Sequence, residues 1–480
     1  MAALLPWAGV QPHDLHFVLI TGANSGVGLG IGQRLIDDFL ASRPLSSHLI
    51  LLPTTRSARK SSETILALRE HLHTAAATSK RLQARAGPNH DPQDAIARVH
   101  VLSVQVDLCN IHSIYAAADQ LVYGTVSDPT GVIPDVKIPR LDAALFNAGI
   151  GGWSGLNWLG LFWQIIRRGI PQATTFPTFK LATYPAVMLD TKKLLGPAET
   201  KKEPTQLAEV FTANLFGHYL LAHELMPLLS RENPKEEPGR IVFTSSIDAG
   251  TEHLSFTHFQ AQRTTPPYES SKRITDIMSL TASLPSVQPL TEPFFKLPSS
   301  SKLPAVRPKI YVTHPGVVCT PLFPLNFVLF FFYRLTMYLS RMLGSPWHVV
   351  ESYLGACATA WVGLEDQAVL DEQKAHLVKW GSAVAPLGGE ARPKKTEVEG
   401  WGWQGDIEDA AALENDADTG MLRKLRGRKW DAVALTKEAR EQFELDGRAC
   451  WTELERLRGE WEGALGRKPG DHLPSKEDKI

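Results

Sequence analysis

From Leu15 to about Ser382, short apolar runs alternate with longer segments in which apolar residues recur at the spacing of a helix. Several runs are rich in β-branched residues and apolar at nearly every position, which is typical of strands buried on both faces. Strand and helix in repetition predict an α/β fold with a doubly wound parallel sheet and right-handed crossovers. The expected strands are Leu15–Ile20, His48–Leu52, Val99–Val106, Leu141–Phe146, Arg240–Ser245, Lys309–His314 and His376–Trp380.

Three long stretches interrupt this alternation. Thr74–Ala97 is polar and predicted to be a loop, Gly151–Gln206 starts aromatic and ends charged, and Pro285–Pro308 is rich in Pro and Ser and predicted to be irregular. Long loops in a compact domain are usually functional or disordered. We therefore expect one domain over 1–382, with insertions at about 151–206 and 285–308.

After Ser382 the composition shifts to Gly, Asp, Glu, Lys and Arg. We expect 383–480 to be a C-terminal extension that is partly disordered, to about Thr419, and then helical over about Leu435–Leu465. This charged helix is expected to be solvated or docked on the surface.

The charge balance, the cysteine count and the lengths of the apolar stretches narrow the class of protein. With 50 basic and 51 acidic residues, the chain has no global field that would steer it to nucleic acid. The four cysteines are widely spaced and form no CxxC pair, which suits a reducing compartment and predicts no metal site. The N-terminal segment is a poor signal peptide, and no apolar stretch reaches the roughly 18 residues of a spanning helix.

A glycine-rich segment, Thr21–Gly28, reads TGANSGVG between the first strand and an amphipathic helix. Glycines permit a tight turn and close approach to the backbone, while a helix start offers free N–H groups and the positive end of its dipole. An ordinary strand-to-helix turn is the alternative. The context favours a site for a dinucleotide pyrophosphate, formed by Gly22, Asn24, Ser25, Gly26, Val27 and Gly28.

The end of the second strand selects between NAD and NADP. An acid there would bind the ribose hydroxyls of NAD, whereas an arginine would bind the extra phosphate of NADP. The sequence continues as LLPTTRSARK, with no acid and with Arg56 first after the strand. We therefore expect NADPH, bound by Arg56, while Arg59 and Lys60 are equally well explained as surface charges of a helix.

Two further strand ends are expected to touch the cofactor. Asp107 either caps the following helix or accepts a hydrogen bond from the adenine amino group. Asn147 opens an Asn-Ala-Gly triplet whose small residues would let the cofactor lie against the edge of the sheet.

Tyr268 and Lys272 are four residues apart and share one face of an expected helix. A tyrosine with its ordinary pKa of about 10 is a poor acid at neutral pH. A nearby ammonium lowers that pKa, so that Tyr268 can give a proton to a carbonyl oxygen as hydride reaches the carbon. Lys272 is also expected to reach the nicotinamide ribose.

Two more polar residues complete the candidate catalytic group. Ser246 follows a strand at its carboxyl end, where its hydroxyl would hold the substrate carbonyl, and Ser245 is the alternative. Asn214 is polar in an otherwise apolar helix. It is either a core asparagine satisfied by backbone groups or part of a water-bridged link that passes protons to Lys272.

These motifs in this order, with a Pro-Gly pair at 315–316, resemble the short-chain dehydrogenase/reductase family over about residues 15–382. The resemblance implies a Rossmann-type fold in which Val317 and Thr320 contact the cofactor, Thr320 at the nicotinamide carboxamide. One departure is the gap between Ser246 and Tyr268, which is longer than the family's usual spacing. The extra loop is expected to bulge outward over the site.

Several longer segments of the sequence are similar to the 3-keto-sterol reductases of ergosterol synthesis. These segments are NAGIGGW, VFTANLFGHYLL, YESSKR, HPGVVCTPLF and KWGS. This implies NADPH-dependent reduction of the 3-keto group of a 4-methylated sterol to the 3β-alcohol, in C-4 demethylation. It also implies peripheral attachment to the cytosolic face of the endoplasmic reticulum and to lipid droplets, beside the other demethylation enzymes and the sterol cyclase. The alternatives are a reductase of another bulky carbonyl and a non-catalytic NADP-binding scaffold of a membrane complex.

A sterol requires an apolar entrance to the site. Two segments are candidates for this entrance. One is the set of aromatic residues in the first insertion, and the other is Pro321–Leu343, whose apolar runs are interrupted by Arg334 and Arg341. The second segment suits a helix lying in a membrane interface better than one crossing it. Buried core and a subunit contact are the alternatives. The aromatic residues are Trp153, Trp158, Phe162 and Trp163.

Overall fold

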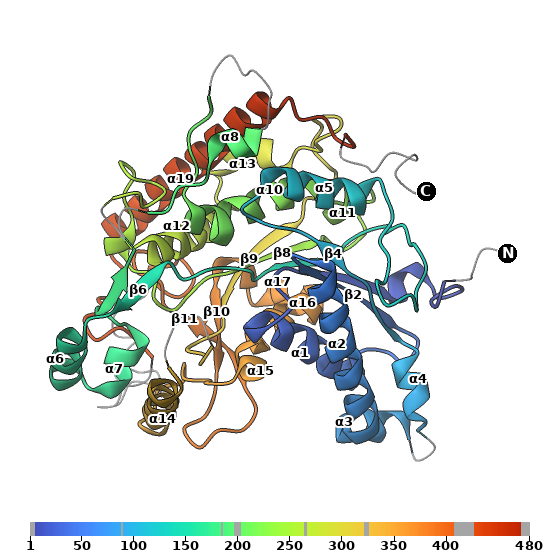
Figure 1. Ribbon diagram of the computed structural model, residues 1–480, viewed down its shortest axis with the longest axis horizontal. Coiled ribbons are helices and arrows are strands. Elements are labelled where there is room, and N and C mark those ends of the chain that lie inside the picture. The colour runs from blue at the N-terminus through green and yellow to red at the C-terminus, as the bar shows by residue number, and fades with distance from the viewer. Residues whose placement is uncertain are drawn as a thin grey trace.

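The structure is a computed structural model that describes residues 5–87, 90–183, 186–195, 203–263, 266–320, 326–407 and 427–471. Its centre is a nine-stranded sheet in the order β11-β10-β9-β8-β5-β1-β2-β3, with β4 pairing β2. All of its strand pairs are parallel except β10 with β11. Helices cover both faces of this sheet (Figure 1), which confirms the predicted doubly wound α/β architecture.

The apolar runs form the strands of the sheet. Five expected strands recur with shifts of a few residues at most, as β1 (Leu15–Ile20), β2 (His48–Thr55), β5 (Ala143–Phe146), β8 (Arg240–Thr244) and β9 (Lys309–His314). The expected strand Val99–Val106 is divided into β3 (Val99–Val101) and β4 (Val104–Gln105). The last one lies later than expected, as β10 (Lys379–Ala383), because His376 belongs to the short helix η4 (Ala375–Leu377).

Alternate residues of β1 enter two separate cores, because successive side chains of a strand point to opposite faces. Phe17 and Leu19 pack with one set of helices, and Val18 and Ile20 pack with the other. The first set is α5 (Ile111–Val122), α10 (Gly217–Glu224) and α12 (Pro267–Thr281). The second set is α1 (Gly26–Ser42), α2 (Ala58–Thr78) and α16 (Cys357–Leu364).

Two of the three interrupting stretches are more helical than expected. Thr74–Ala97 was predicted to be a loop, but α2 continues to Thr78 and is followed by α3 (Lys80–Ala86) and α4 (Pro92–Ile96). The apolar faces of these helices pack on the sheet, so tertiary burial outweighs their polar composition. Within Pro285–Pro308, α13 (Gln288–Phe295) forms despite Pro293 in its interior.

The first insertion builds a separate lobe beside the sheet (Figure 1). A hairpin of β6 (Trp153–Leu156) and β7 (Lys180–Ala182) encloses α6 (Trp158–Arg168) and α7 (Ile170–Thr175). Asn157 caps α6 by accepting a hydrogen bond from Gly160 N at 3.0 Å. Later in the chain, α14 (Phe327–Met342) joins this lobe through a hydrogen bond of 2.9 Å between the hydroxyls of Ser340 and Thr174.

The C-terminal extension is part of the folded body. The sheet passes the expected boundary at Ser382, because β11 (Arg392–Thr396) pairs antiparallel with β10. The predicted flexible stretch is therefore ordered up to 407, and its remainder lies outside the described residues. The predicted C-terminal helix is α19 (Lys437–Leu465), which lies along α12 and α13 (Figure 1) and buries Trp451, Leu454, Leu457 and Trp461.

The remaining elements are short connections between these parts. They are η1 (Pro12–Asp14), α8 (Thr191–Leu195), α9 (Glu209–Phe211), η2 (Thr212–Phe216), α11 (Met226–Leu229), η3 (Thr251–His253), α15 (Ser352–Gly355) and α17 (Gln367–Glu372).

Candidate active site

A cavity of about 1150 Å³ opens at the carboxyl ends of β1, β5, β8 and β9, the edge where doubly wound folds bind ligands. One part of it is lined by the glycine loop and the strand ends, and the other by the first insertion and α14. All the expected cofactor residues line it, and of the expected catalytic residues only Asn214 does not, so the fold brings the separate motifs together. These residues are Gly22, Asn24, Ser25, Gly26, Val27, Gly28, Arg56, Asp107, Asn147, Tyr268, Lys272, Val317 and Thr320.

The glycine loop leaves room for a ligand at the start of α1. Gly22 has φ of +66°, and a Cβ on Gly28 would lie 2.1 Å from the carbonyl oxygen of Gly22, so neither position accepts a side chain without rearrangement. Among the described contacts, the side chain of Ser25 makes no capping bond to α1. The first residues of the helix, Gly26, Val27 and Gly28, line the cavity, and their N–H groups are not capped by Ser25, which fits a pyrophosphate.

A hydrogen-bond network fixes this loop to β5. The hydroxyl of Thr21 accepts from the backbone N–H of Asn147 at 2.9 Å and of Ala148 at 3.1 Å. Its oxygen also lies 2.9 Å from Nε2 of His218 on α10, while Nδ1 of that ring lies 3.4 Å from the carbonyl oxygen of Asn214. This pattern fits a neutral imidazole that donates from Nδ1 and accepts at Nε2, and burial lowers the pKa of His218 to about 3.

The basic residues after β2 differ in position. Arg56 is exposed at the end of the strand and lines the cavity, as does Lys60, whereas Arg59 is turned to Glu63 with a distance of 3.7 Å between Nε and Oε1. Arg56 is therefore well placed for the extra phosphate of NADP, and Arg59 has the surface role that the sequence left open.

Asp107 is not the cap of the helix that follows it. Its carboxylate accepts a hydrogen bond of 3.1 Å from the backbone N–H of Cys109, in the turn before α5, whereas Asn110 caps α5 by accepting from Ser113 N. Because Asp107 also lines the cavity, contact with adenine stays a prediction.

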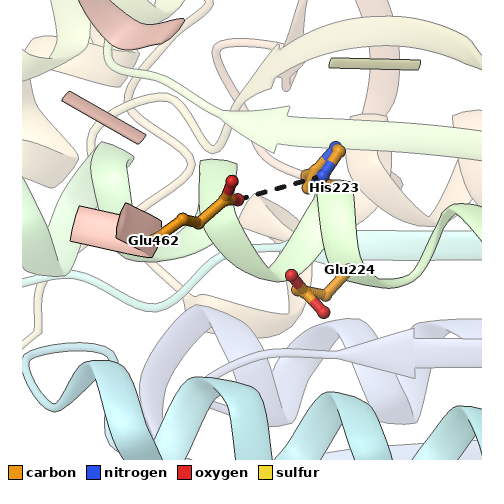
Figure 2. A group of neighbouring side chains, drawn as sticks. All are labelled: His223, Glu224 and Glu462. Atoms are coloured by element: carbon orange, nitrogen blue, oxygen red, sulfur yellow. Dashed lines mark ion pairs between the residues drawn. The ribbon is translucent and has the colours of Figure 1, made fainter. Parts of the chain in front are cut away.

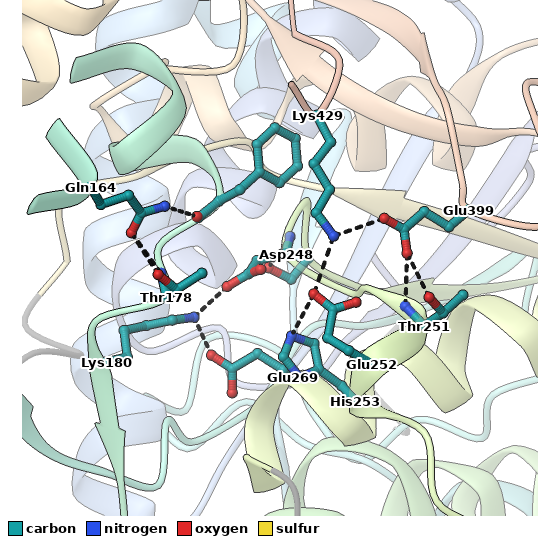
Figure 3. Close-up of polar contacts among 12 residues, drawn as sticks. Gln164, Thr178, Lys180, Asp248, Thr251, Glu252, His253, Glu269, Glu399 and Lys429 are labelled. Atoms are coloured by element: carbon teal, nitrogen blue, oxygen red, sulfur yellow. Dashed lines mark hydrogen bonds and ion pairs between the residues drawn. The ribbon is translucent and has the colours of Figure 1, made fainter. Parts of the chain in front are cut away.

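Tyr268 and Ser246 meet across the long loop. Both side chains line the cavity, and hydrogen bonding by Ser246 acts to lower the pKa of Tyr268. The intervening loop is bound by the C-terminal extension. Figure 3 shows how: Glu399 accepts from the hydroxyl of Thr251 at 2.9 Å, and Lys429 reaches both Glu399, at 2.8 Å, and Glu252, at 3.1 Å. The alternative, Ser245, instead donates to the carbonyl of Lys272 at 3.2 Å.

The ionisation of Tyr268 differs from the expectation. Burial raises its pKa to about 12, while the hydrogen bond from Ser246 and the charge of Lys180 oppose this rise. Lys272 lies 5.6 Å from the centre of the Tyr268 ring and donates to the carbonyl of Thr244 at 2.7 Å. Burial lowers the pKa of Lys272 to about 8, and Asp276 opposes this. The pKa of Tyr268 is therefore raised and not lowered as expected, because burial outweighs the neighbouring positive charge.

Asn214 lies in the π-helical turn η2, and its amide contacts Ile150, which follows β5, and Ser271 of α12. Its Oδ1 accepts from the N–H of Ile150 at 2.8 Å, and its Nδ2 donates to the carbonyl of Ile150 at 3.0 Å and to Ser271 Oγ at 3.1 Å. The amide is thus satisfied as in a core asparagine. A Cβ on Gly149 would lie 2.8 Å from Oδ1 and 4.0 Å from Lys272 Nζ, so Asn214 is also a neighbour of the ammonium.

The sequence did not reveal a charged cluster beside Tyr268. Lys180, from β7, contacts Asp248, which follows β8, and Glu269, which follows Tyr268 (Figure 3). Trp153, from β6, lies with its ring centre 4.7 Å from that of Tyr268 and donates to Glu269 at 3.3 Å. The sequence indicates only the aromatic character of Trp153, because the three charged residues lie in separate segments with no common motif.

The far part of the cavity is apolar and has an exposed rim. Its lining includes Leu161, Phe162 and Ile165 of α6 and Leu329, Phe332, Tyr333 and Met337 of α14. The outer faces of the same helices expose large apolar side chains, with Leu159 83% and Phe327 87% exposed. The alternative that Pro321–Leu343 is buried core is wrong for its described part, which is mostly exposed. In the portion of the chain that the structure describes, we find no helix with the length and hydropathy to span a bilayer.

A second group of polar residues, away from this cavity, resembles a metal site but is an ion-pair network. His223, Glu224 and Glu462 lie close together where α19 meets α10 (Figure 2). Arg458 donates to Glu462 at 2.8 Å and to His223 Nε2 at 3.1 Å, and Arg467 donates to Glu224 at 2.6 Å. Guanidinium groups thus already neutralise the carboxylates, and the group joins the extension to the domain.

Comparisons with known proteins agree with the motifs. The chain is 48% identical over 472 residues to a "3-keto-steroid reductase ERG27" of Gibberella zeae, across 97% of this chain and 98% of that protein. It is 40% identical over 464 residues to a "3-keto-steroid reductase erg27" of Aspergillus fumigatus, across 94% of each. No family model matches the chain. A solved 3-oxoacyl-[acyl-carrier protein] reductase from Brucella melitensis aligns over 72% of this chain and 89% of that chain, at 12% identity and a TM-score of 0.36.

Proposed function

The chain belongs to the family of the fungal 3-keto-steroid reductases, and on that premise we propose that it reduces the 3-keto group of a 4-methylated sterol to the 3β-alcohol with NADPH, in ergosterol biosynthesis. The observation that carries this proposal is that Ser246 and Tyr268 line one cavity together with the glycine loop and with apolar side chains of α6 and α14. A ketone held there would have its oxygen at two hydroxyls and its apolar body among the side chains of α6 and α14.

The residues of the cavity fit NADPH. The open start of α1 and the glycines suit the pyrophosphate, and Arg56 with Lys60 suits the extra phosphate. When bound, NADPH supplies the hydride. Val317 and Thr320 line the part of the cavity that adjoins Gly26, where a Cβ would lie 3.6 Å from the methyl group of Thr320.

The chain's own groups would handle the proton. Ser246 would orient the carbonyl oxygen of the substrate, and Tyr268 would donate its phenolic proton to that oxygen. The raised pKa of Tyr268, about 12, keeps the phenol protonated at neutral pH, as reduction requires. The buried ammonium of Lys272 would stabilise the phenolate left behind.

The test is incubation of the purified protein with NADPH and a panel of ketones that includes 4-methylated 3-keto-sterols, retinoids, steroids and small soluble ketones, followed by product analysis. Conversion of the sterols to 3β-alcohols is expected. Turnover of another bulky carbonyl alone would favour the broader reductase, and NADPH binding without any turnover would favour the scaffold.

We also propose that the enzyme works at the cytosolic surface of the endoplasmic reticulum and of lipid droplets, with α6 and α14 resting on the lipid. The exposed apolar faces of these helices flank the cavity, so a sterol would enter directly from the membrane. Arg167 and Arg168 end α6 and Arg334 is exposed on α14, where they would meet anionic headgroups.

Sedimentation with vesicles of anionic phospholipid tests this location. Polar substitution of Phe330 and Phe331 on α14 should release the protein, whereas Leu66→Ser, on exposed α2, should not. Unchanged sedimentation of the α14 variant would contradict the membrane contact, and a smaller assembly of this variant in gel filtration would instead support a subunit contact. Partner enzymes of C-4 demethylation, and the sterol cyclase, are proposed as neighbours on the same membrane, to be checked by proximity labelling in the fungus.

A further inference from the structure

Three charged side chains are buried together against the proposed proton donor. The side chain of Lys180 is 9% exposed, that of Asp248 14% and that of Glu269 2%. Lys180 Nζ lies 2.5 Å from Asp248 Oδ2 and also contacts Glu269 Oε1. Although burial is the largest influence on it, the two carboxylates together raise the pKa of Lys180, so its ammonium stays charged.

This ammonium faces the catalytic tyrosine directly. Lys180 Nζ lies 5.9 Å from the centre of the Tyr268 ring and 5.0 Å from that of Trp153, which itself packs on Tyr268. Lys272 Nζ lies at a similar distance, 5.6 Å, from the centre of the same ring. Tyr268 therefore has two ammonium groups near its ring, one from its own helix and one from the first insertion.

The charges around Tyr268 act in opposite directions. Lys180 favours the phenolate, whereas Glu269 and Asp248 disfavour it, and all three lie in a partly desolvated site where such effects are large. Among the described residues, Glu269 Oε2 is buried without a hydrogen-bond partner, so this carboxylate depends on Lys180 for its neutralisation. This burial distinguishes the group from a surface ion pair, whose charges stay in contact with water.

We propose that Lys180 is a positioning residue that sets the acid strength of Tyr268 and couples it to the substrate-binding insertion. By pairing with Glu269 and Asp248, Lys180 cancels the carboxylates nearest to the phenol and holds Trp153 against its ring. When the proton leaves the Tyr268 oxygen for the carbonyl oxygen of the substrate, the negative charge on the phenolate is stabilised by the ammonium. The ketone gains this proton together with the hydride, and the alcohol forms. The substrate in this step rests on the proposed function, but the titration of Tyr268 does not.

The experiment measures the ionisation of Tyr268 itself in the full-length protein. Stopped-flow pH jumps follow the ultraviolet absorbance of the phenolate, and the difference from the same variant carrying Tyr268→Phe isolates this one residue. Lys180→Met removes the charge, Lys180→Arg keeps it, and Lys193→Met on exposed α8 is the matched control from the same insertion. Glu269→Gln removes one opposing carboxylate and keeps an acceptor for Trp153.

Lys180→Met and Glu269→Gln are expected to shift the pKa of Tyr268 in opposite directions. Lys180→Met should raise the pKa of Tyr268 by about one unit or more, which corresponds to at least a tenfold smaller phenolate fraction at a given alkaline pH. Glu269→Gln should lower the pKa of Tyr268. Lys180→Arg should keep this pKa near that of the wild-type protein, and Lys193→Met should leave it unchanged. The pH dependence of alcohol oxidation with NADP⁺ should move in the same sense.

Two results would overturn the proposal. One is an unchanged Tyr268 titration in both Lys180→Met and Glu269→Gln; the other is a shift of the same sign in both, which would indicate loosened packing. If Lys180→Met does not fold, the direction of the Glu269→Gln shift decides alone. Failure to reduce sterols with these titration shifts intact would contradict the proposed substrate and leave the role of Lys180 standing.

Discussion

The indole N–H of Trp451 on α19 donates to the carbonyl of Met278 on α12, with a distance of 3.1 Å. This bond joins the C-terminal extension to the helix that carries Tyr268 and Lys272. Gly447 of α19 also packs on Thr281, since a Cβ there would lie 2.5 Å from its hydroxyl. The extension is thus a support of the catalytic helix, and its loss should affect both stability and the site.

Trp451→Ala should lower the free energy of unfolding by about 3–5 kcal/mol, because a fully buried aromatic side chain is removed and its cavity cannot refill. Leu445→Ala, on the exposed face of the same helix, should change it by no more than about 0.5 kcal/mol. Urea unfolding followed by tryptophan fluorescence and by circular dichroism measures both. Similar losses in the two variants would mean that α19 does not dock as described.

Tyr268→Phe should reduce kcat for ketone reduction by at least about 100-fold, because the only change is the loss of the phenolic proton donor. The affinity for NADPH should change little, as the aromatic ring and Lys272 stay in place. Stopped-flow turnover and fluorescence titration with NADPH separate the two quantities. An active Tyr268→Phe enzyme would remove Tyr268 from the chemistry.

Arg56→Ala should weaken NADPH binding by roughly 10- to 100-fold, the loss expected for a charge-assisted hydrogen bond to phosphate, and should leave NADH binding nearly unchanged. Arg59→Ala is the matched control, because Arg59 is turned to Glu63. Isothermal titration with the two cofactors provides the comparison. Equal losses for NADPH and NADH in Arg56→Ala would contradict the assignment.

Acid should destabilise the protein through His218. Its folded-state pKa is about 3, below the ordinary value of about 6.5, so as the pH falls below 6.5 the unfolded chain takes up a proton that the folded protein refuses. Stability is therefore fully present above pH 6.5 and declines toward pH 3, by about 1.4 kcal/mol per pH unit for this one group.

His218→Gln should make that decline shallower by the same amount, since glutamine does not titrate and still offers an acceptor to Thr21. Urea unfolding at a series of pH values measures the slope. A slope that is identical with and without His218 would show that this imidazole does not control acid stability.

The sequence alone determined the parts of this protein that depend on local spacing. Buried parallel strands must be apolar at nearly every position, so β1 and β9 were predicted to the residue. A pyrophosphate loop must be glycine-rich and must precede a helix, and Tyr268 and Lys272 must be one helical turn apart, so both motifs were readable, together with Arg56 at the end of β2.

Only the tertiary structure decided which distant side chains share an environment. The partner of an ion pair is not encoded by either residue alone, so Lys180 meeting Glu269 could not be foreseen from its place in an insertion. The same holds for the pKa of Tyr268, which depends on desolvation by the whole fold. An amphipathic helix such as α19 shows that it has an apolar face, but its docking site on α12 arises from the complementary shapes of two surfaces that meet only when the chain is folded.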